Sequence, residues 1–92
     1  MLNEPLKSDQ ARLHIRMILK CGITRFTRHA NLEMVKDGLS QVDVVNVLRA
    51  GLVENSEFIN GSWRYRVRTN KIYVVVCFRN ETTLIVITAW RK

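Results

Sequence analysis

The run from Trp63 to Arg68 constrains the fold more than any other part of this sequence, because it alternates aromatic or aliphatic side chains with arginine. Successive side chains of a β-strand point to opposite faces of the sheet, so one face of this strand is apolar and the other cationic. A second strand-like run, 71–76, follows Thr69-Asn70, which is typical of a two-residue turn. The sequence therefore predicts a β-hairpin with two chemically different faces.

The turn determines which residues face each other across this hairpin. A two-residue turn at 69–70 places Arg66 opposite Tyr73 and Arg68 opposite Lys71. An antiparallel sheet needs only one apolar face for a core. We therefore expect the cationic face to carry the function of the protein.

The net charge of +7, from 15 Lys and Arg against 8 Asp and Glu, is concentrated in the second part of the chain. Segment 61–92 contains seven basic residues and one acidic residue, whereas 1–60 contains eight basic and seven acidic residues. A cationic region on a small domain attracts polyanions. Arginine binds phosphate in bidentate geometry and is more frequent here than lysine, so nucleic acid is the expected partner.

The length of 92 residues predicts one domain, 1–92, with a single modest core. The apolar runs fall short of the ~20 residues that a membrane span needs, and the N-terminus lacks the basic-then-apolar order of a signal peptide. Cys21 and Cys77 have no metal-binding spacing and are expected to be ordinary packing residues. We therefore expect a soluble cytoplasmic protein.

Periodicity and capping residues predict an N-terminal helix, a short edge strand and two further helices. Their expected ranges are 5–20, 23–28, 29–38 and 40–50. The last of these helices begins with a capping box of Ser40 and Asp43 and ends at Gly51. After Leu52 the pattern changes to a period of two residues, which predicts strands for the rest of the chain.

Four strands are expected at 53–59, 62–68, 71–79 and 82–90. Asn60-Gly61 is the strongest hairpin signal in the chain, and Asn80-Glu81 is expected to form the last turn. No helical pattern intervenes, so the strands should form a four-stranded antiparallel meander. The predicted fold class is α+β, with the helices packed on one face of the sheet.

Pairing through these turns sorts the strand side chains into two faces. The expected core face contains Phe58, Trp63, Tyr65, Val67, Ile72, Val74, Val76, Phe78, Ile85 and Ile87. The expected cationic face contains a row of Asn55, Arg66, Tyr73 and Thr88 and a row of Arg68, Lys71 and Trp90, flanked by Arg64. A polar solvent face is common in antiparallel sheets, and Glu57 opposite Arg64 could simply pair with it. Four clustered cations without a counter-charge nevertheless favour a phosphate-binding function.

His29 is a further candidate for proton transfer, because histidine titrates near neutral pH. It lies beside Arg28 at the expected start of a helix, although a lone histidine is more often structural. The sequence has no acidic cluster suited to Mg²⁺ and no Cys/His spacing suited to Zn²⁺. We therefore expect no metal and no other cofactor.

The segment from His29 to Gly51 resembles a small bacterial domain family long described as of unknown function. The residues that carry the resemblance are His29-Ala30, Met34, Gly38-Leu39-Ser40, Asp43-Val44, Val47-Leu48 and Gly51. That family continues with strands similar to Tyr65-Arg66, Ile72–Val75 and Ile85–Thr88. The resemblance therefore covers the chain from residue 23 onward, 23–92, and leaves the N-terminal helical part, 1–22, outside. The family pattern has arginine where this chain has Glu33 and Asp37, so no RNA contact is carried over to these two positions.

The resemblance implies a relationship to the RelE- and MqsR-like ribonuclease toxins of the barnase–colicin–RelE superfold. It implies the toxin of a type II toxin–antitoxin system, an endoribonuclease that cleaves mRNA, free or on the ribosome, and inhibits translation. The implied partner is a cognate antitoxin encoded next to it, a zinc-finger or other DNA-binding protein.

Metal-independent cleavage of RNA needs a base for the 2′-OH, donors that stabilise the charged phosphorus centre and an acid for the 5′-oxygen. We expect Arg66 and Arg64 to hold the phosphate. We expect Tyr73 or His29 to transfer protons and Thr88 to orient a neighbouring group. The expected RNA-binding residues are Arg68, Lys71, Trp90, Arg28 and Arg91, of which Trp90 would stack on a base.

Two other classes of function fit the same residues. A non-catalytic RNA- or DNA-binding module would bind in a salt-dependent way without cleavage. A protein-interaction domain would dock an acidic partner on its basic face.

Overall fold

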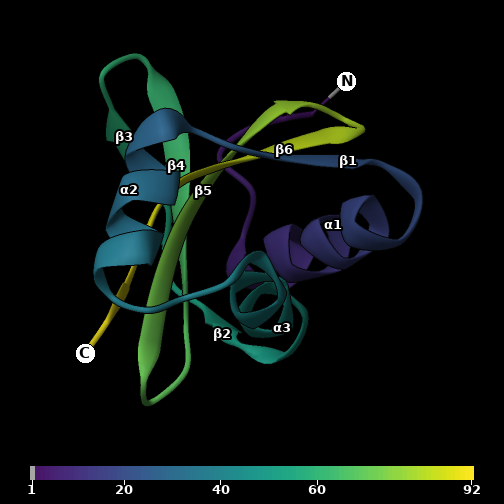
Figure 1. Ribbon diagram of the computed structural model, residues 1–92. Coiled ribbons are helices and arrows are strands. Elements are labelled where there is room, and N and C mark those ends of the chain that lie inside the picture. The colour runs from purple at the N-terminus through teal and green to yellow at the C-terminus, as the bar shows by residue number, and fades with distance from the viewer. Residues whose placement is uncertain (1) are drawn as a thin grey trace.

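The computed structural model describes residues 2–92 and has a mixed α+β fold of three helices and a six-stranded sheet (Figure 1). The helices are α1 (Ser8–Cys21), α2 (Arg28–Lys36) and α3 (Gln41–Ala50). The strands are β1 (Ile23–Phe26), β2 (Leu52–Val53), β3 (Glu57–Ile59), β4 (Ser62–Arg68), β5 (Ile72–Asn80) and β6 (Thr83–Arg91). The predicted α+β class is confirmed. The expected four-stranded meander is instead a six-stranded sheet, because 53–59 is divided into β2 and β3 and because β1 joins the sheet.

The sheet has the strand order β1-β6-β5-β4-β2, and β3 pairs with the other half of the same edge of β4. β1 is an edge strand, as expected, and it runs parallel to β6. All the other pairs are antiparallel. The short β2 pairs with Val67 and Arg68 at the end of β4, which brings the end of α3 close to Arg68.

α1 and α3 pack against each other on one side of the sheet, whereas α2 lies apart from them beside β6 (Figure 1). The buried side of α1 consists of Ala11, Ile15 and Ile18, which recur at helical spacing. The helices were expected to pack together on one face of the sheet, but only α1 and α3 do so. α2 follows β1 along the edge of β6. The Thr27 hydroxyl joins the start of α2 to β6 by donating to the Ile87 carbonyl at 3.0 Å, and it caps the helix by accepting from Ala30 N.

The predicted start and end of α3 are confirmed. The Ser40 hydroxyl accepts from the backbone N–H of Asp43 at 3.1 Å, and the Asp43 carboxylate accepts from Ser40 N at 2.8 Å. The helix ends at Gly51, where a Cβ atom would lie 2.6 Å from the Val47 carbonyl oxygen and 2.9 Å from that of Arg68. The absence of a side chain at Gly51 thus allows the end of α3 to approach β4 closely.

Three registers differ from the predicted ones. The Asn60-Gly61 turn is confirmed by φ angles of 49° and 83°, and β3 pairs with β4 as expected. The chain then shifts by one residue between β3 and β2, so that Val53 pairs with Val67. This shift buries Val53 and turns Glu54, rather than Asn55, toward the cationic face, because a one-residue slip exchanges the two faces of a strand.

The turn between β4 and β5 lies at 70–71 rather than at 69–70. Thr69 N donates to the Ile72 carbonyl at 3.0 Å, and Arg68 pairs with Tyr73 instead of Lys71. Arg66 accordingly pairs with Val75 rather than Tyr73. A two-residue shift keeps every side chain on its predicted face, so the hairpin remains apolar on one side and cationic on the other.

The β5–β6 turn falls at 81–82 rather than 80–81, and β6 contains an irregularity between the partners of Val75 and Val76. Val76 therefore pairs with Val86, and the predicted core positions Ile85 and Ile87 are wrong. The buried apolar residues of β6 are Leu84, Val86 and Ala89, and Thr83 is buried beside them. Phe58 was also expected in the core and is instead 60% exposed, because β3 extends beyond the helices that cover the sheet.

The remaining predicted core residues are confirmed. Tyr65, Val67, Val74, Val76 and Phe78 are buried in one cluster with the apolar sides of the helices, and Trp63 and Ile72 pack against it. Within residues 2–92, none of the helices is long and apolar enough to cross a membrane.

Candidate nucleic-acid interface

The side chains of β4, β5 and β6 that point away from the core form one cationic face, which consists of Arg64, Arg66, Arg68, Tyr73, Thr88 and Trp90. All six are half-buried. The pairing of the strands aligns Arg68 with Tyr73 and Trp90 in one row, and Arg66 with Val75 and Thr88 in the next row. The structure therefore brings together six of the ten residues that the sequence assigned to the site.

Two aromatic side chains, Tyr73 and Trp90, pack against each other on this face. The rings of Tyr73 and Trp90 lie with their centroids 5.1 Å apart. The Arg66 guanidinium carbon lies 5.3 Å from the Tyr73 ring centroid, and the ammonium nitrogen of Lys92 lies 4.3 Å from the same centroid. Cations above an aromatic face are attracted to its π electrons, so the ring helps to position both charges. Lys92 was not among the predicted site residues.

Glu54 supplies the counter-charge that the sequence analysis did not anticipate. Its Oε1 accepts from Arg66 Nε at 2.7 Å, and its Oε2 accepts from Arg68 Nε at 2.6 Å. Burial of the carboxylate opposes ionisation, but the hydrogen bonds from Arg68 and Arg66 outweigh this effect and lower the pKa of Glu54. Glu54 is therefore ionised at neutral pH and fixes both arginines on the sheet.

The bonds to Glu54 leave donors available on both arginines. A guanidinium group has five N–H donors, and Glu54 accepts only from the Nε–H of each residue. The side chain of Arg66 is 42% exposed and that of Arg68 is 35% exposed. The terminal amino groups can consequently bind an incoming phosphate without loss of the Glu54 contacts.

A hollow of about 160 Å³ adjoins this cluster. It is lined by Asn55, Glu57, Ile59, Arg64, Arg66 and Val75. The Nε atom of Arg64 is buried and has no hydrogen-bond partner within residues 2–92. A buried donor without a partner is costly, so this hollow would be stabilised by an acceptor such as a phosphate or ribose oxygen.

The other four predicted site residues lie outside the cluster. Arg28 and His29 are exposed at the start of α2, beside the edge of β6. Lys71 is exposed in the β4–β5 turn, and its carbonyl accepts from Lys92 N at 2.8 Å. Arg91 donates from its guanidinium to the Asp37 and Gly38 carbonyls at 3.1 and 3.3 Å, so it fastens the end of α2 to β6.

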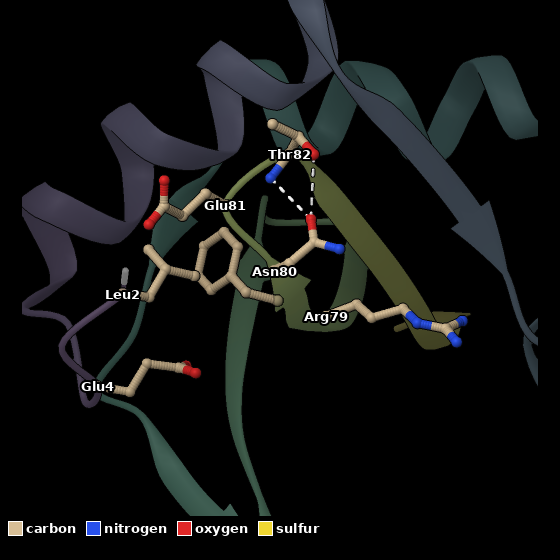
Figure 2. Close-up of a pocket in the computed structure, with 7 residues that line it drawn as sticks. Leu2, Glu4, Arg79, Asn80, Glu81 and Thr82 are labelled. Atoms are coloured by element: carbon tan, nitrogen blue, oxygen red, sulfur yellow. Dashed lines mark hydrogen bonds between the residues drawn. The ribbon is translucent and has the colours of Figure 1, made fainter.

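A different cavity, of about 620 Å³, lies between the N-terminal segment and the β5–β6 turn (Figure 2). Asn80 Oδ1 accepts from the N–H and the hydroxyl of Thr82 at 2.9 and 3.1 Å and shapes the turn. The lining contains two carboxylates, Glu4 and Glu81, against one arginine, Arg79, so this cavity suits phosphate less well than the cationic face does. Within the described residues, no cluster of three potential metal ligands is present.

The sequence comparison identifies residues 26–91 with a domain of unknown function, DUF4258. Curated proteins and solved structures yield no match to the chain. The match agrees with the resemblance of 23–92 to a domain family of unknown function. The relationship to RelE- and MqsR-like ribonucleases stays a prediction.

Proposed function

The chain belongs to the DUF4258 family of domains of unknown function, and we propose that it is a metal-independent endoribonuclease that acts on mRNA as the toxin of a type II toxin–antitoxin system. The observation that carries this proposal is the Arg66–Glu54–Arg68 cluster, which lies next to the Tyr73–Trp90 pair and places the Arg66 guanidinium over the Tyr73 ring. It combines phosphate donors, an ionised carboxylate and an aromatic platform on one face. The implied RelE-like fold relationship belongs to the same proposal.

RNA is the substrate that suits this set of groups, because its 2′-OH can act as the nucleophile without a metal. The 2′-oxygen attacks the adjacent phosphorus, its proton passes to a base, and the bond to the 5′-oxygen breaks as that oxygen receives a proton. The products are a 2′,3′-cyclic phosphate and a 5′-OH. The extra negative charge that develops on the phosphoryl oxygens needs fixed cationic donors.

We assign the phosphate to the free amino groups of Arg66, with Arg64 in the adjoining hollow as the second donor. Glu54 becomes the first candidate for the base, because it is ionised and lies within hydrogen-bond distance of Arg66. Tyr73 would deliver the proton to the 5′-oxygen. Arg68 and Lys92 would bind the flanking phosphates, and Trp90 would stack on a base.

A non-catalytic RNA-binding module is the second candidate function. It is favoured by the exposed position of His29 at the start of α2, which separates this imidazole from the arginine cluster on β4. The implied antitoxin would then cover the same cationic face with acidic side chains.

The test is cleavage of a single-stranded RNA in the presence of a metal chelator. Wild type should cleave, and Arg66→Ala should lower the rate by about 10²–10³, the cost of a lost transition-state donor. Tyr73→Phe should remove proton transfer while the aromatic platform is retained.

Arg25→Ala provides a matched control, because Arg25 is an exposed arginine on β1, at the other edge of the sheet. It should cleave at the wild-type rate. Equal rates for wild type, Arg66→Ala and Tyr73→Phe would remove the assignment, and RNA binding without cleavage would favour the second candidate function.

A further inference from the structure

A second cationic surface lies in the helical layer, on the other side of the sheet. Arg12, Arg16, Leu19 and Lys20 of α1 and Arg49 and Ala50 of α3 line a groove of about 730 Å³, the α1–α3 groove. Its lining contains four basic residues and no acidic residue. The functional assignment of the cationic face makes no use of these charges.

The geometry of α1 places the cations at regular intervals. Arg12, Arg16 and Lys20 are spaced four residues apart, which sets them about 6 Å apart along one side of the helix. Arg16 Nε donates to the Arg49 carbonyl at 2.9 Å, so the two walls of the groove are joined. A row of evenly spaced cations suits a chain of evenly spaced phosphates.

The groove and the cationic face meet around β2. Ala50 lines the groove, and Glu54 lies on the cationic face, so the chain between them spans at most about 14 Å. Leu52 pairs with Arg68, and Glu54 N donates to the Arg66 carbonyl at 2.8 Å. Within the described part of the chain, the two-residue strand β2 thus lies between the two basic surfaces.

We propose that the α1–α3 groove is a second binding site for single-stranded RNA, into which a strand bound on the cationic face continues around the edge of the sheet at β2. This inference rests on the proposed function, which places RNA on the cationic face. The exposed part of Leu52, at 58%, offers an apolar contact where the strand turns the edge.

RNA fits the groove better than an acidic protein does. Protein interfaces depend on buried aromatic or aliphatic anchors, whereas the groove offers only Leu19 and Ala50 beside its cations. Binding to the phosphate backbone is mainly electrostatic and needs no apolar anchor. The ligand must also be long enough to occupy both sites, and a strand of several nucleotides meets this requirement.

The test compares binding of two 2′-O-methylated oligouridylates, of about 4 and about 12 nucleotides, by fluorescence anisotropy. The methyl group blocks the 2′-oxygen and prevents cleavage during the measurement. The groove variant is Arg12→Gln with Lys20→Gln, two exposed residues at the surface of α1. The matched control is Arg25→Gln with Lys36→Gln, which removes one exposed arginine and one exposed lysine elsewhere.

The groove variant should bind the long RNA about tenfold more weakly and reduce the slope of log K against log salt by about 1.4, because two phosphate contacts are lost. It should bind the short RNA like wild type, and the control variant should bind both RNAs like wild type. Arg49→Gln, on the opposite wall of the groove, should reproduce the selective loss.

Unchanged binding of the long RNA by the groove variants, or an equal loss in the control variant, would overturn the proposal. Tight binding of an oligoglutamate that depends on Arg12 and Lys20, without a preference for long RNA, would assign the groove to an acidic protein instead. The nuclease assignment can fail without this proposal failing. In that case unmodified RNA would not be cleaved, but the length-dependent binding would persist.

Discussion

At the scale of single residues, Glu54 determines the character of the cationic face. Without it, Arg66 and Arg68 would repel each other across one face of β4. With it, the two side chains are held by Oε1 and Oε2 of one carboxylate. The face is therefore an organised set of donors rather than a collection of mobile charges.

Replacement of Glu54 by Gln separates binding from catalysis. The variant should bind RNA more tightly, because a negative charge is removed beside the phosphate site, and it should cleave more slowly if Glu54 is the base. Loss of the two ion pairs should also lower the free energy of unfolding by about 1 kcal/mol. Glu81→Gln, which removes an exposed carboxylate in the β5–β6 turn, away from the cationic face, is the control. A Glu54→Gln protein that cleaves at the wild-type rate would exclude Glu54 as the base.

The lowered pKa of Glu54 predicts a pH dependence of stability. The folded-state pKa is below the unfolded value of about 4.3, so the stabilisation is complete above that value. It is lost as the pH falls through the folded-state pKa. Chemical denaturation at several pH values should show a constant difference between wild type and Glu54→Gln near neutrality that shrinks at acidic pH. A difference that grows on acidification would contradict this explanation.

At the scale of elements, the junction of α3 and β2 positions both basic surfaces. In Gly51→Ala the new Cβ would meet two backbone carbonyl oxygens, those of Val47 and Arg68, at 2.6 and 2.9 Å. Because backbone atoms cannot turn aside as a side chain can, we expect a loss of about 1–3 kcal/mol in unfolding free energy. Urea denaturation would measure it, with Asn46→Ala on the exposed side of α3 as the control. A neutral Gly51→Ala change would show that this approach is not tight.

Local signals predicted those elements whose structure is decided by neighbouring residues. The Ser40–Asp43 cap, the end at Gly51 and the Asn60-Gly61 turn are all of this kind. The registers that depend on irregularities could not be predicted, because an added residue in one strand leaves no distinct mark on the alternating pattern. This explains the missed position of Glu54 and the exchange of Ile85 for Val86 in the core.

The same distinction applies to the candidate site. Arg64, Arg66 and Arg68 share one strand, so alternation alone placed them on one face. Tyr73 and Trp90 joined them although the β4–β5 register was wrong, because a two-residue error preserves the face. Arg91 could not be separated from the site by sequence, since its contacts with Asp37 and Gly38 depend on where α2 ends in space.

At the scale of the whole molecule, the N-terminal segment is fastened to the centre of the sheet. The buried hydroxyl of Tyr65 accepts from Leu6 N at 3.0 Å and donates to the Glu4 carboxylate at 2.9 Å. Burial of the phenol raises the pKa of Tyr65 to about 12. The region matched by the family, 26–91, contains Tyr65 but neither of these partners nor α1.

Tyr65→Phe should therefore loosen the N-terminal segment. The variant leaves Leu6 N without its acceptor and should lose about 1–2 kcal/mol in unfolding free energy. Faster hydrogen exchange at the Leu6 amide would report the change directly, while RNA binding should stay at the wild-type level because Tyr65 faces the core. Tyr73→Phe, on the opposite face, is the control for this exchange measurement. Unchanged exchange at Leu6 in Tyr65→Phe would contradict the proposed anchoring.

The Glu54 carboxylate between Arg66 and Arg68 also affects which ligands can bind the cationic face tightly. A lone small anion can bind only the terminal amino groups, beside an ionised carboxylate that repels it, so its net gain in free energy is small. A polymer that offers many charges in succession engages several donors together, so each contact supports the next. We therefore expect free nucleotides and inorganic phosphate to be poor inhibitors, and strand length to decide which molecules this protein retains.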